Sequence, residues 1–155
     1  MAELRLAVQG HARFDGLPAR PTLARWVGLA LERDAEITLR FVGATEGRRL
    51  NRDFRGRDYA TNVLTFGYSA APAVHADIVL CVPVIRREAR EQRKTLRGHL
   101  AHLVVHGVLH AHGYDHERPS RARRMEAIEV AILARLGLPD PYRTPDAATR
   151  ATGSR

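Results

Sequence analysis

The sequence is poor in cysteine and in long apolar segments, and each shortage excludes a class of protein. Of its 155 residues only Cys81 is a cysteine, so no disulfide can form within the chain and a reducing compartment is favoured. Cys81 lies in an apolar run, which predicts a buried, unreactive thiol. No apolar run approaches the roughly 20 residues that cross a membrane, and no early segment has the pattern of a secretory signal. We therefore expect a cytoplasmic protein with no membrane partner.

Lysine is also nearly absent, because Lys94 is the only one, yet the chain has 25 basic against 17 acidic residues and a net charge of +8. Almost all of the positive charge is therefore arginine, whose planar guanidinium can bind two phosphate oxygens at once. A basic balance is compatible with nucleic-acid binding, although a bias towards arginine can also reflect genome composition. Charge alone shifts the prediction only slightly towards RNA or DNA.

What the chain does contain is a dense group of histidines near its middle. His106 and His110 are four residues apart, so on a helix their imidazoles project from one face. Gly113 can adopt the left-handed conformation that ends a helix, and the turn then brings His116 towards the same point. Three neutral imidazoles suit zinc or a similar divalent ion, and three protein ligands instead of four leave one position open for water. The spacing predicts a catalytic metal site rather than a structural one.

Three polar residues around this group have different expected roles. His112 is two residues after the second ligand, so we expect it to face away from the site, towards solvent. His102 lies one turn before the first ligand, and it either orients that ligand or is a hydrogen-bonded histidine of a packed helix. Asp115 could orient a ligand or accept a proton, but capping the turn that carries His116 is the favoured role.

The spacing H-x-x-x-H-x-x-G-x-x-H is also that of the metzincin peptidases, which makes peptide hydrolysis an alternative function. In those enzymes a glutamate general base follows the first histidine, and here that position is Gly107. The methionine turn beneath a metzincin site has no counterpart, since only Met1 and Met125 exist and Met125 falls in a helical pattern. Both differences disfavour a peptidase.

Hydrophobic periodicity predicts a single α+β domain with strands early in the chain and helices late. The expected strands are 4–8, 36–42, 62–66 and 76–82, with a loop at 67–74. The expected helices begin at Pro21, at Pro83, at about Leu96 and near Ser120, and a short helix that Thr45 could cap runs through Leu50 to about Phe54. We expect a small mixed sheet of about four strands packed with about five helices, one of them a zincin-like metal helix. The domain should span residues 1–139, with a flexible tail at 140–155.

Beyond the histidines, several segments make the chain resemble the YbeY family of bacterial endoribonucleases. The stretch LNRDFRGRDYATNVLTF at 50–66 is similar to the family pattern L-N-x-x-Y/F-R-x-x-D-x-x-T-N-V-L-S-F, and DIVLC at 77–81 is similar to its G-D-I-V-I-C strand. Residues 88–92 resemble the following helix, and 99–116 resemble the metal helix and turn. The similarity covers about residues 36–142 in the same order. Thr65, Gly67 and Ala76 depart from the family pattern, and none of them is an expected ligand.

The resemblance implies a cytoplasmic, metal-dependent endoribonuclease that acts on single-stranded RNA, chiefly ribosomal RNA, in maturation of the small-subunit RNA 3′ end and in ribosome quality control. The family's metal ligands carry over to His106, His110 and His116. Zn²⁺ is the expected cofactor, although nickel, cobalt and copper also accept imidazole. Single-stranded RNA and the ribosome are the expected partners, and no DNA is expected.

The family's functionally important arginine carries over to Arg55, which we assign to phosphate binding and transition-state stabilisation. From spacing alone, Arg55 would be one surface arginine beside Arg52 and Arg57. A further alternative is a non-catalytic, ribosome-associated module with a structural zinc. Three ligands disfavour that function, unless Asp115 or His102 completes the coordination shell.

Overall fold

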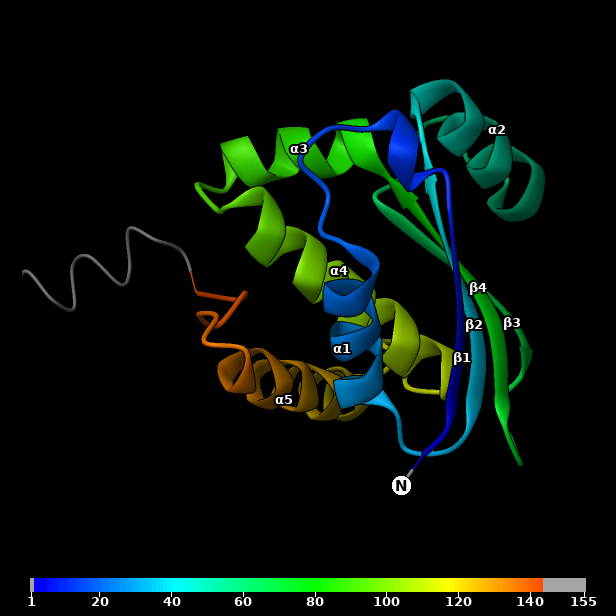
Figure 1. Ribbon diagram of the computed structural model, residues 1–155, viewed down its shortest axis with the longest axis vertical. Helices are drawn as coiled ribbons and strands as arrows, with labels where there is room; N and C mark the ends of the chain where they lie inside the picture. The colour runs from blue at the N-terminus through cyan, green and yellow to red at the C-terminus, as the bar shows by residue number, and fades with distance from the viewer. Residues whose placement is uncertain (1, 144–155) are drawn as a thin grey trace, which may run out of the picture.

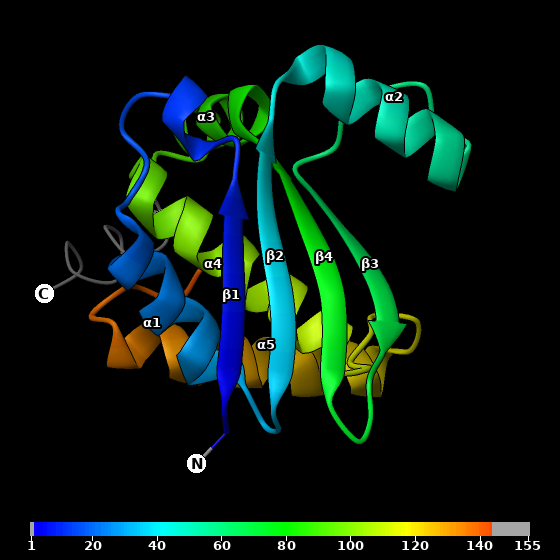
Figure 2. The same ribbon diagram turned by 45° about the vertical axis from the view of Figure 1, so that its right-hand side comes forward.

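The four strands of the computed structural model, which describes residues 2–143, form one mixed sheet (Figures 1 and 2). They are β1 (Leu4–Gln9), β2 (Ala35–Val42), β3 (Val63–Ser69) and β4 (Val74–Cys81), in the order β1-β2-β4-β3. β1 pairs with β2 and β2 with β4 in parallel, whereas β3 is antiparallel to β4. β3 is therefore an edge strand, and the predicted mixed α+β sheet is confirmed.

Five α-helices accompany the sheet in the described part of the chain. They are α1 (Arg20–Ala30), α2 (Ala44–Arg55), α3 (Val82–Glu91), α4 (Leu96–Ala111) and α5 (Pro119–Arg135), with a short 3₁₀ turn, η1 (His11–Arg13), after β1. α1, α3 and α5 each have proline in their first positions, where its missing N–H costs nothing. α1, α4 and α5 lie on one side of the sheet, and α2 lies beyond the end where β2 and β4 finish (Figures 1 and 2).

α4 is the central helix of the domain, in contact with α1, α3, α5, β3 and β4. Ten of its 16 residues are buried, so it is apolar almost all round, as a core helix is. The side chain of Thr95 caps its start by accepting a hydrogen bond from the Gly98 N–H at 3.0 Å. At Gly107 the helix meets β4 so closely that a Cβ atom would lie 2.8 Å from Cγ2 of Ile78. This helix is therefore a rigid support for the histidines at its end.

Two predictions of local structure are wrong. The expected loop at 67–74 is shorter, because β3 continues to Ser69 and β4 begins at Val74. Backbone pairing between the two strands extends the ladder through residues that have no apolar alternation. Thr45 does not cap α2, since it lies inside a helix that begins at Ala44 after Gly43. Only Gly47 and Asn51 of α2 are buried, so its sequence has too few apolar residues to mark where the helix begins.

His112 was expected to face solvent, and this prediction is also wrong, because only 8% of the residue is exposed. Its Nδ1–H donates to the Val108 carbonyl at 2.8 Å, and its Nε2 accepts from the Glu32 N–H at 3.1 Å. The backbone of His112 still follows the helix, with its N–H bonded to the Val108 carbonyl, but the side of α4 that it faces is covered by the chain at Glu32. Cys81 is buried as predicted, and burial raises the pKa of its thiol.

The predicted tail begins at residue 140, but its first four residues turn back onto the domain. The Pro141 carbonyl accepts a hydrogen bond from Nζ of Lys94 at 2.8 Å, and the Tyr142 hydroxyl reaches α5. Residues 144–155 of the predicted tail lie outside the described residues. Within residues 2–143 no helix combines the length and the apolarity that crossing a membrane requires.

Candidate metal and phosphate site

The three predicted ligands and the predicted phosphate-binding arginine line one cleft of about 530 Å³. His106 and His110 come from the last two turns of α4, and His116 comes from the loop that follows it. Arg55 is the last residue of α2, and residues 61–66 at the start of β3 form a wall between them. Four residues that are up to 61 positions apart in the sequence are thus gathered in one cleft.

The three imidazoles lie close to one another. The ring centroid of His106 is 6.0 Å from that of His110 and 4.9 Å from that of His116, with which it stacks at an interplanar angle of 15°. Imidazoles that share one tetrahedral ion, with metal–nitrogen distances near 2.0 Å, have centroids about 5 Å apart. Gly113 allows this approach, because its φ of 105° turns the chain sharply after α4. The ring separations are therefore close to those that a shared ion imposes.

His110 has the protonation state that a metal ligand needs. Loss of surrounding water inside the cleft lowers the pKa of His110, although the residue is in contact with solvent at the cleft mouth, and the neighbouring His106 and His116 and Arg55 lower it further. Its imidazole is thus neutral at pH 7 with a lone pair available.

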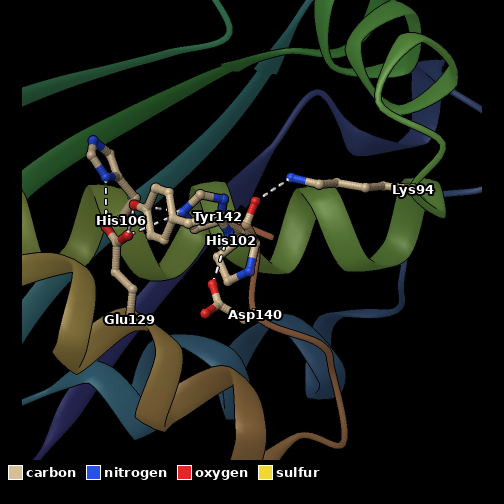
Figure 3. A network of polar contacts seen from close by, with 7 residues as sticks. Lys94, His102, His106, Glu129, Asp140 and Tyr142 are labelled. Carbon is tan, nitrogen blue, oxygen red and sulfur yellow. Dashed lines mark hydrogen bonds and ion pairs between the residues drawn. The ribbon is translucent and has the colours of Figure 1, made fainter. Parts of the chain in front are cut away.

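A buried glutamate that was not among the predicted site residues forms a hydrogen bond with His106 (Figure 3). Glu129 of α5 is completely buried, and one carboxylate oxygen accepts from Nδ1–H of His106 at 2.7 Å. The other oxygen accepts from Nε2–H of His102 at 3.1 Å and from the hydroxyl of Tyr142. Figure 3 shows the second ring nitrogen of His106 pointing away from Glu129. The carboxylate therefore fixes the tautomer in which Nε2 of His106 has the free lone pair.

Glu129 remains ionised in spite of its burial. Burial alone raises the pKa of a carboxyl group, but the hydrogen bonds from His102, His106 and Tyr142 outweigh it and lower the pKa of Glu129 to about 2. The same arrangement raises the pKa of Tyr142, through its burial and its bond to the carboxylate. The Glu129 carboxylate thus keeps its negative charge beside His106, and three hydrogen-bond donors stabilise that charge.

Glu129 could have been found in the sequence by its position. On α5 the buried residues Met125, Ile132 and Leu133 form an apolar stripe, and Glu129 falls in the same stripe at helical spacing. A glutamate in a core-facing stripe is almost never buried without a partner. The partner, however, lies on another helix, and helical periodicity does not identify it.

The buried network is itself a second group that could hold an ion. Among the described residues, candidate ligand atoms of His102, His106 and Glu129 all lie within 4.8 Å of one another. These atoms are already joined by direct hydrogen bonds, and the Tyr142 hydroxyl adds a third. An ion there would have to displace those bonds. By contrast, no hydrogen bond joins the side chain of His110 or His116 to another residue within 2–143, so the cleft is the better candidate.

The other polar residues of the prediction have structural roles. One oxygen of Asp115 accepts from the Glu117 N–H at 3.0 Å and the other from Arg121 at 3.2 Å, so Asp115 caps the turn before His116 and does not line the cleft. His102 does not line the cleft, and it meets the site through its hydrogen bond to Glu129 and through the edge of the His106 ring, at a centroid distance of 6.2 Å. His99, earlier in the histidine stripe of α4, donates its Nε2–H to the Glu88 carboxylate at 2.9 Å and is a hydrogen-bonded core histidine.

Arg55 differs from the other arginines of α2. Arg48, Arg49 and Arg52 each lie within 4.0 Å of a carboxylate, namely Asp58, Glu46 and Asp53. Arg55 forms no ion pair or hydrogen bond with any residue in 2–143, and it faces the cleft that the histidines line. Its guanidinium is therefore available to an anion bound beside the imidazoles.

The structure removes the support for a peptidase. The position of the peptidase base is Gly107, where a side chain would collide with Ile78. Among the described residues, none of those that line the cleft is an aspartate or a glutamate. The cleft thus has cationic and imidazole groups and lacks the carboxylate that activates water in a metzincin.

Imidazoles gathered at the end of a buried helix, with an uncommitted guanidinium across the cleft, place the chain among metal-dependent hydrolases. The family model described as "Endoribonuclease YbeY" matches residues 22–137. The chain is 58% identical over 152 residues to an endoribonuclease YbeY of Bordetella pertussis, covering 90% of this chain and 96% of the relative. It is 56% identical over 149 residues to that of Burkholderia pseudomallei, covering 91% and 81%. The chain therefore belongs to the YbeY family of endoribonucleases, and the resemblance drawn from its motifs is confirmed.

A solved structure agrees with the fold. The solution structure of a Thermotoga maritima protein matches with a TM-score of 0.56 and 24% identity, covering 89% of this chain and 99% of that one. At this level of identity the likeness concerns the arrangement of helices and strands alone.

Proposed function

We propose that the chain is a metal-dependent endoribonuclease that binds one divalent ion through His106, His110 and His116 and a phosphate of RNA through Arg55. The observation that supports this most directly is that all four side chains line the same cleft. Membership of the endoribonuclease family supports the substrate class. Zn²⁺ is the ion we propose, since three neutral imidazoles with an open position suit it.

Each residue has a distinct part in the reaction. A bound divalent ion supplies a Lewis acid and makes water nucleophilic at neutral pH. His106 is oriented by Glu129, so its Nε2 faces the cleft. Arg55 binds the phosphate by two parallel hydrogen bonds and stabilises the negative charge that gathers on its oxygens during cleavage. Thr61 and Thr65 also line the cleft, and a threonine hydroxyl is a donor that suits the same oxygens.

The substrate we propose is single-stranded RNA, chiefly ribosomal RNA, with the ribosome as partner and the cytoplasm as location. The net charge of +8 and the arginines of α2 favour a polyanion. Within this function we propose maturation of the 3′ end of the small-subunit RNA and ribosome quality control, as the family resemblance implies.

Metal-loaded protein is expected to cleave a short single-stranded RNA and to leave single-stranded DNA of the same sequence intact. Chelation should abolish cleavage, and added Zn²⁺ should restore it, because the hydrolytic water depends on the ion. Gel analysis of a fluorescent RNA measures both steps. RNA cleavage that is insensitive to chelator, or chelator-sensitive turnover of casein without RNA cleavage, would contradict the proposal.

Replacing Glu129 with glutamine is expected to weaken metal binding about 10- to 100-fold, because partners behind a ligating histidine typically contribute that much to affinity. Glutamine keeps the shape of the side chain but removes the charge that fixes the His106 tautomer. Competition with a chromophoric chelator measures the affinity, and ¹⁵N chemical shifts of the imidazoles measure the tautomer. Glu126→Gln, on the same helix but outside the network, is the matched control. Equal affinities in the two variants would show that Glu129 has no part in the site.

A further inference from the structure

Phe54 is a solvent-exposed aromatic residue at the mouth of the cleft. It lies in the last turn of α2, directly before Arg55, and 67% of the residue is exposed. It nevertheless lines the same cleft as Arg55 and the three histidines. The buried residues of α2 are Gly47 and Asn51, so the core does not need a phenylalanine at this position. Packing of the core therefore does not explain why a phenylalanine lines the cleft.

One side of the ring packs against another aromatic ring. Its centroid is 4.8 Å from that of Phe66, and the two rings meet edge to face at 70°. Phe66 in turn packs against the smaller core cluster beside α2, which includes Val42 and Leu64. Phe54 is therefore supported from one side by the core while most of its surface stays open. A rigid, exposed aromatic ring is the form that base-stacking platforms take in proteins that bind single strands.

The neighbouring charge indicates what the ring contacts. Arg55 has no carboxylate partner among the described residues, so an anionic group is expected next to Phe54. A flat apolar group linked to an anion is what one nucleotide of RNA presents. The cleft volume of about 530 Å³ lies in the range of about 300–1,000 Å³ in which small ligands bind. Charge and shape together favour a nucleotide over an apolar protein segment.

We propose that Phe54 is the stacking platform for one unpaired nucleobase of the RNA whose phosphate Arg55 binds, an inference that rests on the proposed function. In a duplex both faces of each base are covered by its neighbours, so a base must leave the stack before Phe54 can contact it. The platform therefore selects single-stranded RNA by the accessibility of a base face. It does not read the sequence, since every base has such a face.

The test compares Phe54→Ala with Phe54→Trp in the metal-loaded protein. The alanine variant should raise KM for a short single-stranded RNA about 5- to 100-fold with a much smaller change in kcat, because one stacked base is lost. The tryptophan variant should keep the wild-type KM. Fluorescence anisotropy on the same RNA, read before cleavage proceeds, should show the same loss of affinity. Tyr68→Ala is the matched control, because Tyr68 is 60% exposed but does not line the cleft.

An abasic scan identifies the contact itself. One nucleotide at a time is replaced by an abasic residue, and one position should weaken binding to wild type while having no further effect on Phe54→Ala. Unchanged KM and affinity in Phe54→Ala would overturn the inference, and so would an abasic penalty that persists in that variant. If Phe54→Ala instead fails only to bind a protein while its RNA affinity is intact, the ring is a protein contact and the inference is wrong.

The two proposals can fail separately. If wild type binds RNA through Phe54 but cleaves none with any divalent ion, the proposed nuclease function fails and the platform remains. If wild type cleaves RNA and Phe54→Ala cleaves it with the same KM, the function remains and the platform fails. Circular dichroism and thermal unfolding should match wild type in all three variants, since Phe54 and Tyr68 are both largely exposed.

Discussion

The His110→Ala variant is expected to purify without a stoichiometric ion and to lose RNA cleavage. His110 is one of only three imidazoles in the cleft, and its removal leaves two ligands for an ion that needs at least three from the protein. Partners that only orient a ligand contribute about 10- to 100-fold to affinity, so loss of a ligand should exceed about 100-fold. Elemental analysis of the purified variant and chelator competition measure the ion, and a fluorescent RNA measures cleavage. The residue is exposed on α4, so folding should be unaffected.

The matched control is His102→Ala, which also separates the two possible metal groups. If the ion binds in the cleft, His102→Ala keeps a stoichiometric ion, because His102 contacts only Glu129 and Tyr142 by hydrogen bonds. If the ion binds at His102, His106 and Glu129 instead, His102→Ala loses it and His110→Ala retains it. A variant of His110 that binds no ion but cleaves RNA as fast as wild type would make the metal irrelevant to catalysis. If His110→Ala is metal-free and inactive but as stable as wild type, the ion is needed for catalysis and is not a purely structural zinc.

Arg55→Glu is expected to reduce kcat/KM for RNA by about 10²–10³-fold while leaving the bound ion in place, because a preorganised donor to the developing charge is lost. The new carboxylate also repels the phosphate that the guanidinium would bind. Arg55→Lys should fall between wild type and Arg55→Glu, since lysine keeps the charge but cannot form two parallel hydrogen bonds. Steady-state kinetics and metal analysis on the same preparation measure the two effects.

Arg52→Glu is the control for Arg55→Glu, because Arg52 lies in the same helix and its replacement changes the net charge of the protein by the same amount. Arg52 is paired with Asp53 at 3.4 Å and does not line the cleft, so its replacement should affect RNA cleavage much less. Similar losses in the two variants would mean that α2 acts through its total charge. An Arg55→Glu variant that binds metal and cleaves RNA like wild type would end the assignment of Arg55.

The shared helix face of His106 and His110 and the turn after α4 could be predicted because they depend on local geometry. The four-residue spacing of His106 and His110 fixes one helix face, and Gly113 has the positive φ that its position after α4 required. The apolar run of β4 and the prolines that open α1, α3 and α5 were likewise local features. These features identify elements without any knowledge of how the elements pack.

The residues that the sequence did not reveal depend on contacts between distant segments. Glu129 is important because α5 places its carboxylate against His106, 23 positions earlier. Arg55 was assigned through the family resemblance, whereas the feature that distinguishes it from the paired Arg48 and Arg52 depends on the folded chain. His112 was misplaced because its side of α4 is covered by a distant segment, from which the Glu32 N–H, 80 positions away, donates to its Nε2. Hydrophobic periodicity within one segment does not identify contacts between residues that are far apart in the sequence.

The contact between Gly107 and Ile78 also limits what this chain can become. The step from a phosphodiesterase to a protease would need a glutamate at residue 107, a change of one side chain on paper. In the folded molecule its Cβ would lie 2.8 Å from Cγ2 of Ile78 on β4, so the side chain of Ile78 would first have to move. That change would disturb the packing of α4 on β4 at the same position where it introduced the base. Close contact between this helix and the sheet therefore separates two chemistries that share one histidine spacing.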